Sequence, residues 1–337
     1  MSVPSSTRRS RGEAVFFEGI YGQGKPLAIL KRSVEKGRVP HAFLFHGMKG
    51  VGKRTTALAF AKTLNCDTLD ACGLCPSCRK IENGNHPDVV VIEPRGQFIK
   101  IEDIRDLRNQ MRFRPLEGRK RIFILIDAER MNITSANAVL KTLEEPSLAN
   151  VLILISSRPY QLPMTILSRC QKLRFHPIPS IEVARCLEEK AGLDAETAAA
   201  LAASSGGSIG RALEMHGESY LAERKQFIEK IGEGFSDPMK GILFAGDFGK
   251  ERKDIQMRFE ILKNWYRDLL VYKETGEAAR LVHRDFADDI QAMAGGMTAE
   301  EILSDLDTIA WAYDALEKNA NKQLTLEAMA FKLSRQA

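Results

Sequence analysis

The first half of the chain alternates short, nearly continuous apolar runs with segments in which apolar residues recur at helical spacing. The helical spacing occurs in residues 55–64, 101–113 and 132–144. Strand-like runs separated by helices are typical of a parallel sheet that is covered on both faces, so we expect an α/β fold. The strand-like runs are residues 41–46, 88–93, 121–127, 151–156 and 172–175.

The pattern changes at His176-Pro-Ile-Pro179, after which the strand signal disappears. From Ser180 to about Met215 we expect short helices rich in Ala, Leu and Glu, with Asp194 and Ser208 as N-caps. The glycine pair 206–207 separates two of these helices.

From about residue 218 onward, apolar positions indicate long amphipathic helices. We expect helix breaks near Gly232–Gly234, Gly241, Gly276 and Gly295-Gly296. The predicted organisation is therefore a disordered tail over 1–14, an α/β domain over 15–177, a small helical lid over 178–217 and an all-helical end domain over 218–337.

Residues 47–55 lie between the first strand and the first helix of the α/β pattern. They match the phosphate-binding loop G-x-x-x-x-G-K-[ST] at Gly47, Gly52 and Lys53, and Gly50 lies between them. The position that should supply a magnesium-binding hydroxyl holds Arg54. We expect the loop architecture and impaired magnesium-dependent hydrolysis, while present-day nucleotide binding is left open.

The neighbouring residue Thr55 and the segment Asp127–Glu129 also bear on the magnesium site. Thr55 follows Arg54 but is turned away by about 100° on a helix. Asp127 ends a predicted strand, where P-loop proteins hold the magnesium shell. Ala128 cannot accept a proton, and Glu129 would point the other way if the strand continued.

Four of the six cysteines form the pattern C-x5-C-x2-C-x2-C, which predicts structural tetrahedral zinc with no open position for water. An iron–sulfur cluster or free thiols are the alternatives, and His86 could replace one sulfur. Cys170 and Cys186 are isolated. The expected ligands are Cys66, Cys72, Cys75 and Cys78.

Composition adds little to this picture. The chain of 337 residues is 44% hydrophobic and 28% charged, with a net charge of +5 that permits nucleic-acid contact without requiring it. No apolar run approaches the ~20 residues of a membrane span, and the basic N-terminus lacks the apolar stretch of a signal peptide. The cytoplasm is the expected compartment.

With these motifs in place, the chain resembles the clamp-loader subunits of the AAA+ class, and most closely the δ′ subunits of bacterial DNA polymerase III. Specific motifs carry the resemblance over about residues 15–215, and domain order alone carries it beyond. The matching stretches are His41–Phe45 with Gly47–Lys53, the cysteine knob 66–78, Asn137–Pro146 and Leu162–Cys170.

The resemblance implies roles for three further residues. Arg169, in Ser168-Arg169-Cys170, reaches ATP held by a neighbouring subunit as a trans-acting arginine finger. Ser157 takes the position of a polar γ-phosphate sensor, and Arg211 that of a lid arginine. The end domain becomes the oligomerisation collar, and the partners become the motor γ/τ and wrench δ subunits, with the sliding clamp and primed DNA reached through the complex.

In these relatives a glutamate follows the strand-end aspartate, whereas this chain has Ala128. The chain also stops after one helical domain, without the long extension of some motor subunits. We interpret it as a stator within the DNA polymerase holoenzyme, lacking ATPase activity of its own but serving a neighbour through Arg169. Two alternatives stay open: an active motor subunit using Thr55 and Glu129, and a zinc-bearing nucleic-acid-binding module on a degenerate P-loop scaffold.

Overall fold

The computed structural model describes residues 17, 19–94, 96, 98–144, 147–216, 220–235 and 237–334. The expected tail 1–14 and the motif residues Glu145 and Pro146 lie outside this description. Contacts divide the chain into two compact units. An α/β unit comprises Met1–Glu182 with Gly207–Gly210, and a helical unit comprises Val183–Gly206 with Arg211–Ala337.

The α/β unit contains a five-stranded sheet in the order β2-β3-β4-β1-β5, with every strand pair parallel, as the apolar runs predict. All residues of β4 are buried, whereas the edge strand β5 exposes all but Leu173. The difference follows from position, because a central strand is covered on both faces and an edge strand is not. The strands are β1 (Ala42–His46), β2 (Val89–Ile92), β3 (Arg121–Leu125), β4 (Asn150–Ser156) and β5 (Gln171–Arg174).

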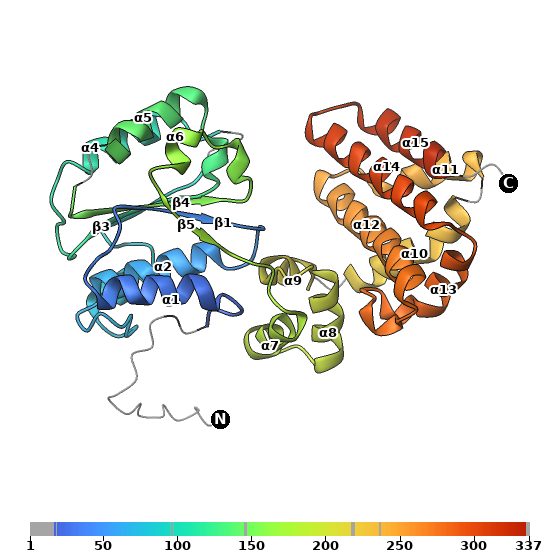
Figure 1. The fold of residues 1–337 in the computed structure, drawn as a ribbon, viewed down its shortest axis with the longest axis horizontal. Coiled ribbons are helices and arrows are strands. Elements are labelled where there is room, and N and C mark those ends of the chain that lie inside the picture. Colours follow the sequence, from blue (N-terminus) through green and yellow to red (C-terminus); the bar gives the residue numbers. More distant parts are fainter. Residues whose placement is uncertain are drawn as a thin grey trace. The chain divides into compact units, whose positions relative to one another are not determined.

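Helices cover both faces of this sheet (Figure 1). Helices α1 (Gly24–Glu35) and α2 (Lys53–Asn65) lie on one face, and the short α3 (Pro76–Glu82) packs beside α2. The other face carries α4 (Ile101–Gln110), α5 (Ile133–Glu144) and α6 (Met164–Leu167). A continuous apolar core fills the space beneath the second group and includes Leu44, Phe123, Leu125, Leu152 and Val139.

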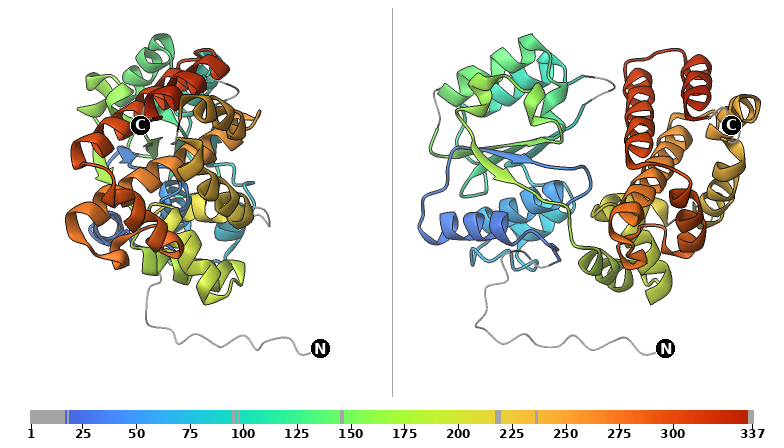
Figure 2. Two further views of the ribbon diagram at one scale, coloured as in Figure 1. Left: turned by 90° about the vertical axis from the view of Figure 1, so that its right-hand side faces the viewer. Right: turned by 45° about the vertical axis from the view of Figure 1, so that its right-hand side comes forward.

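The helical unit stacks helices against one another without a sheet (Figure 2). Helix α12 contacts α10, α13 and α14, and its apolar positions Phe259, Leu262 and Trp265 are buried as expected. The helices are α7 (Ser180–Ala191, whose first turn belongs to the α/β unit), α8 (Ala195–Ser204), α9 (Ile209–Met215, whose first two residues belong to the α/β unit), α10 (Tyr220–Gly234), α11 (Pro238–Ala245), α12 (Arg252–Thr275), α13 (Ala287–Gly295), α14 (Ala299–Glu317) and α15 (Lys322–Leu333).

Most predicted helix ends are confirmed, but Gly241 is not a break. Asp194 caps α8 by accepting the Thr197 amide at 2.9 Å, and Gly276 ends α12 in the left-handed conformation. Gly241 instead lies buried inside α11, where a Cβ atom would overlap the Ser334 hydroxyl. Because Gly241 has no side chain, α11 can approach α15 closely. In the described part of the chain, we find no helix with the length and apolar character to span a bilayer.

Candidate functional site

The loop between β1 and α2 has the conformation expected of a phosphate-binding loop. Gly47 has φ of 146°, and a Cβ atom there would overlap the Phe175 carbonyl oxygen, so only glycine fits. Gly50 and Gly52 are also left-handed, and Gly52 caps α2. Backbone N–H groups at the start of a helix favour an anion, so the loop retains the geometry for holding phosphate.

The ammonium of Lys53 is held inside this loop. It donates to the carbonyl oxygens of Gly47 and Met48 at 2.6 and 2.7 Å, and to Ser157 Oγ at 3.3 Å. Burial lowers the pKa of Lys53 to about 8, although the carboxylates of Glu129 and Asp127 act in the opposite direction. A bound phosphate would have to draw this ammonium away from two backbone carbonyls.

Arg54 does not point a free charge at the loop. Its Nη1 lies 2.7 Å from Glu93 Oε1, just beyond the end of β2. Thr55 is exposed on α2, and the hydroxyl of Thr56 donates to the Gly52 carbonyl at 2.8 Å. The P-loop position that should offer a magnesium-binding hydroxyl is thus held by a paired arginine, and the Thr56 hydroxyl is engaged with the backbone.

The segment after β3 places Glu129 differently from the sequence expectation. The strand ends at Leu125, Asp127 is left-handed with φ of 49°, and a 3-10 turn follows. Because the strand does not continue, Glu129 turns toward β4, and its Oε1 accepts the Ser157 amide at 3.0 Å. Its Oε2 is buried without a hydrogen-bond partner among the described residues. Ala128 is buried in the core, and the Asp127 carboxylate lies 3.8 Å from Arg130 Nε.

Cationic side chains gather beside the loop. Burial lowers the pKa of His46, and Arg174, Lys172, Lys53 and His176 lower it further. His46 and Arg174 end β1 and β5, Lys172 lies within β5, and Lys53 begins α2 after the P-loop, so these groups lie at or near one edge of the sheet. The local field therefore favours an anion, while the magnesium-binding groups are missing or engaged elsewhere.

Arg169 lies at the surface of the α/β unit, between α6 and β5. Its Nη1 donates to the Thr165 carbonyl at 3.0 Å, and its Nη2 lies 3.1 Å from Glu144 Oε1 at the end of α5. The side chain is 38% exposed and that of Glu144 51%. A half-exposed pair of this kind is weak in water, so a neighbouring phosphate could compete for the guanidinium.

Arg211 belongs to the helical unit. Its Nη1 lies 2.9 Å from Glu260 Oε2 on α12, and Lys263 contacts the same oxygen at 2.8 Å. Burial raises the pKa of Glu260, but Arg211 and Lys263 outweigh it and lower the pKa below its ordinary value. Arg211 thus anchors α9 to α12 in this structure.

The four cysteines of the knob converge on one point. Their sulfur atoms all lie within 4.8 Å of one another, and the amides of Cys72, Cys75 and Cys78 each donate to the sulfur of an earlier cysteine at 3.4–3.5 Å. Such N–H···S bonds stabilise thiolates, which are the ligand form of cysteine. The donor set fits a structural zinc ion held by Cys66, Cys72, Cys75 and Cys78.

His86 is not a fifth candidate ligand. Its Nε2 lies 3.1 Å from Ser77 Oγ, and its Nδ1 accepts the Asp88 amide at 3.1 Å. Both ring nitrogens are therefore occupied, one by Ser77 of α3 and the other by the Asp88 amide just before β2. Cys170 and Cys186 are buried away from the knob, one beside the sheet and one on α7.

Two residues of the loop region escaped the sequence reasoning. The sequence pattern does not indicate Glu93 as the partner of Arg54, and it turns Glu129 away only if the strand continues, whereas β3 ends at Leu125. The signal for Glu93 was available, because it follows a strand adjacent to β3 and carboxyl ends of parallel strands meet at one edge. The turn that redirects Glu129 contains no glycine or proline, so the sequence does not predict it.

Comparisons with known proteins match nearly the whole chain. A family model described as DNA polymerase III, delta subunit, matches residues 22–179. A second model, described as the C terminal of the DNA polymerase III delta subunit, matches residues 218–335. The first match falls on the α/β part of the sequence, and the second falls on the all-helical part.

Curated relatives agree with these models. The DNA polymerase III subunit delta′ of Bacillus subtilis is 32% identical over 92% of this chain and 96% of its own length. That of Pseudomonas aeruginosa is 32% identical over 86% of this chain and 90% of its own length. The tau subunit of Escherichia coli is 40% identical, but over 48% of this chain and 25% of its own length.

Proposed function

Because this chain belongs to the DNA polymerase III delta′ subunit family, we propose that it serves as the stator of a clamp loader that places the sliding clamp on primed DNA during replication. The observation that carries the proposal is the end-to-end match to delta′ subunits, compared with a match to only a quarter of tau. Its partners are then the tau/gamma motor subunits and the delta subunit, and its place of work is the cytoplasm, where the chromosome lies.

The chain's own P-loop does not turn over ATP in this proposal. Hydrolysis in P-loop proteins depends on a magnesium ion between the β- and γ-phosphates. Arg54 replaces the hydroxyl ligand and is paired with Glu93, while Asp127 lies near Arg130. The cationic groups around His46 favour an anion, so the loop in this proposal retains passive nucleotide binding without a metal.

Arg169 is the residue that acts, and it acts on a neighbour. Its guanidinium is at the surface, and its only described ion pair is the half-exposed one with Glu144. Exchanging that carboxylate for the γ-phosphate of ATP on an adjacent motor subunit would neutralise charge that develops during phosphoryl transfer. The zinc ion proposed for the knob is structural, because four sulfurs leave no open position.

A second candidate function has one observation in its favour. Glu129 carries a buried oxygen without a hydrogen-bond partner among the described residues and lies close enough to Lys53 to raise its pKa. A carboxylate in that place could orient water, as an active motor subunit requires. Steady-state ATPase of the isolated chain separates the two candidates. ATP turnover that depends on Lys53 and that Glu129→Gln abolishes supports the motor. An absence of turnover supports the stator.

The clamp-loader assignment itself is tested by assembly. The chain is mixed with the tau/gamma and delta subunits of its own source, and complex formation and DNA-stimulated ATPase are measured with and without it. The stator proposal expects a stable complex whose ATPase requires this chain. Failure to assemble, or the same activity without it, would overturn the proposal.

A further inference from the structure

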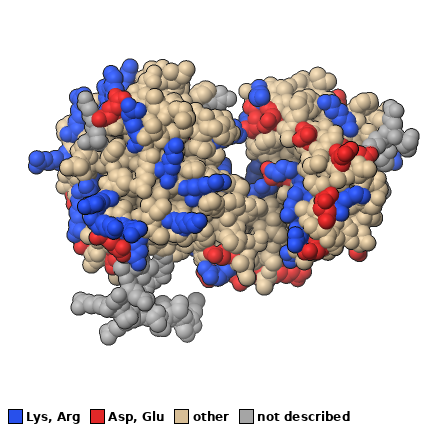
Figure 3. Space-filling view, in the orientation of Figure 1, with Lys and Arg blue, Asp and Glu red and all other residues tan. Residues whose placement is uncertain are grey.

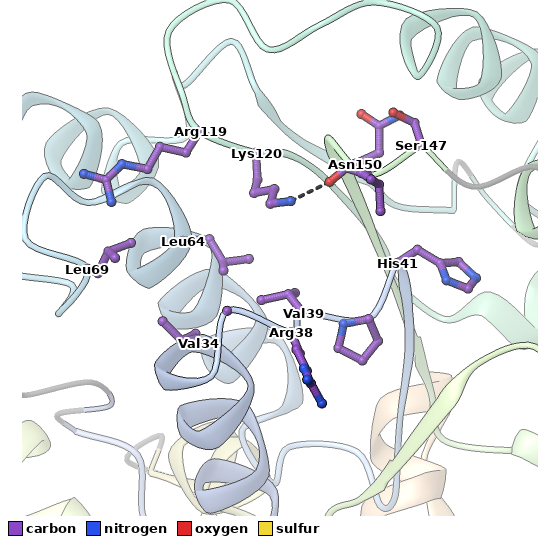
Figure 4. Close-up of a pocket in the computed structure, with 13 residues that line it drawn as sticks. Val34, Arg38, Val39, His41, Leu64, Leu69, Arg119, Lys120, Ser147 and Asn150 are labelled. Carbon is purple, nitrogen blue, oxygen red and sulfur yellow. Dashed lines mark hydrogen bonds between the residues drawn. The ribbon is translucent and has the colours of Figure 1, made fainter.

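A cavity of about 590 Å³ opens at the edge of the sheet opposite the P-loop (Figure 4). It lies where the chain enters β1, β3 and β4, between the last turns of α1 and α2 and the cysteine knob. None of the P-loop residues discussed above lines it, and neither does Arg169. The cavity is therefore separate from the P-loop and from Arg169.

The walls of this cavity are aliphatic. Val34 comes from α1, Val39 from the approach to β1 and Leu64 from the end of α2, while Leu69 belongs to the knob. At its rim Leu148 is 92% exposed. Leu148 and the cavity walls together form a contiguous apolar patch, and such a patch rimmed by polar residues is typical of an interaction surface.

The charged side chains of the rim are all basic, and the other polar residues of the lining are His41, Ser147 and Asn150. Arg38, Arg119 and Lys120 line the cavity, and no aspartate or glutamate does. Lys120 Nζ donates to the Leu148 carbonyl at 2.5 Å and Arg119 Nη2 to the Asp67 carbonyl at 3.0 Å. These carbonyl bonds orient the cations without neutralising them. The face of the α/β unit seen in Figure 3 likewise carries more Lys and Arg than Asp and Glu.

We propose that this cavity binds an acidic peptide segment of a partner protein. An aliphatic side chain of the segment would enter between Val39, Leu64 and Leu148, and flanking carboxylates would face the three cations. The complementarity is chemical: apolar walls exclude a strongly hydrated ligand, and the cationic rim selects negative charge. The chain's own tail does not fit, because residues 1–16 hold three arginines and one glutamate.

The test uses the full-length, zinc-loaded chain and a random-peptide display library as the probe. Selected peptides should combine aspartate or glutamate with an aliphatic residue, and their binding should weaken as ionic strength rises. The double variant Arg38→Glu/Lys120→Glu should weaken the best peptide by more than about tenfold. Leu148→Asp should do the same, and its exposed position lets the variant fold. Arg32→Glu, on the exposed face of α1, is the matched control and should bind as the wild type does.

Three results would overturn the proposal. The library could yield no enriched peptide, or peptides without an excess of acidic residues. The selected peptides could also bind the cavity variants as tightly as they bind the wild-type chain. Circular dichroism of each variant ensures that lost binding is not lost folding.

Discussion

The guanidinium of Arg54 lies 2.7 Å from the carboxylate of Glu93, so the residue that replaced the P-loop hydroxyl is tied to the neighbouring strand end. Both side chains are about half exposed, and the pair is therefore worth little in stability. In the proposed function its consequence is chemical, because the position that would offer a magnesium-binding hydroxyl holds one side of an ion pair instead.

Restoring the hydroxyl should restore a response to magnesium. We expect Arg54→Thr to bind ATP about tenfold more tightly with Mg²⁺ than without it, since a metal-bound hydroxyl contributes on the order of 1.5 kcal/mol. The wild-type chain should show no such difference. Fluorescent-nucleotide titration with Mg²⁺ or with a chelator measures both, and Arg32→Thr is the control. Magnesium-enhanced binding by the wild type would contradict this account of Arg54.

The knob should hold one zinc ion per chain. We expect Cys75→Ser to lose the metal and lower the melting temperature, because the remaining three sulfurs cannot close a tetrahedral site. Cys186→Ser, at a buried cysteine outside the knob, should keep its zinc. Elemental analysis of the purified chains decides the matter. Iron with visible absorbance, or wild-type protein without metal, would refute the zinc assignment.

Asp88 should make the stability of the α/β unit depend on pH. Its buried carboxylate accepts the amides of Leu116, Glu117 and Gly118, each at 2.8 Å. Burial raises the pKa of Asp88, but these amides outweigh it and bring the pKa below its ordinary value of 3.8. The folded state thus holds the charged form more strongly than the unfolded state does. This contribution is present above about pH 4 and is lost as the pH falls through the folded pKa.

The variant Asp88→Asn should therefore be destabilised near neutral pH, by about 2–4 kcal/mol, because an amide cannot accept all three bonds. The difference from wild type should shrink as the pH falls toward about 3. Urea denaturation at several pH values measures it. A gap that stays constant across this range would show that the carboxylate charge is not the cause.

The same substitution should have opposite effects at two glycines of the helical unit. Gly241→Ala should destabilise the chain by about 1–3 kcal/mol, because the added methyl overlaps Ser334, which directly follows the closely packed α15. Gly232→Ala, where nothing lies within 4 Å of the new atom, should stabilise α10 by up to about 1 kcal/mol. Thermal unfolding of the two variants gives the comparison. Equal shifts would mean that α11 and α15 do not pack as described.

These glycines also mark what can be predicted from the sequence. The apolar runs predicted the parallel sheet because central strands must be apolar on both faces, and the cysteine spacing predicted the cluster that the fold assembles. Gly241 has no local signature that distinguishes a helix break from a close helix contact. The outcome depends on α15, which lies far along the chain, and pattern reasoning within a short window cannot reach it.

The loop region shows the same division. The G-x-x-x-x-G-K pattern predicted the conformation of Gly47–Lys53, since left-handed glycines are required locally. The position of Glu129 depends instead on where β3 ends and on a left-handed aspartate, which is uncommon enough not to be assumed. Its contact with Ser157 is a property of the folded sheet edge and not of either segment alone.

The central claim is that Arg169 serves another subunit's ATP. Its direct test is the DNA-stimulated ATPase of the complete clamp loader assembled with Arg169→Ala, beside Glu144→Gln, which removes only the arginine's partner, and Arg32→Ala as a surface control. We expect the Arg169→Ala chain to assemble normally. At the ATP site that Arg169 serves, the rate of hydrolysis should fall by about 10³-fold, while both other variants retain activity. An Arg169→Ala complex that assembles and hydrolyses ATP at the wild-type rate would contradict the claim.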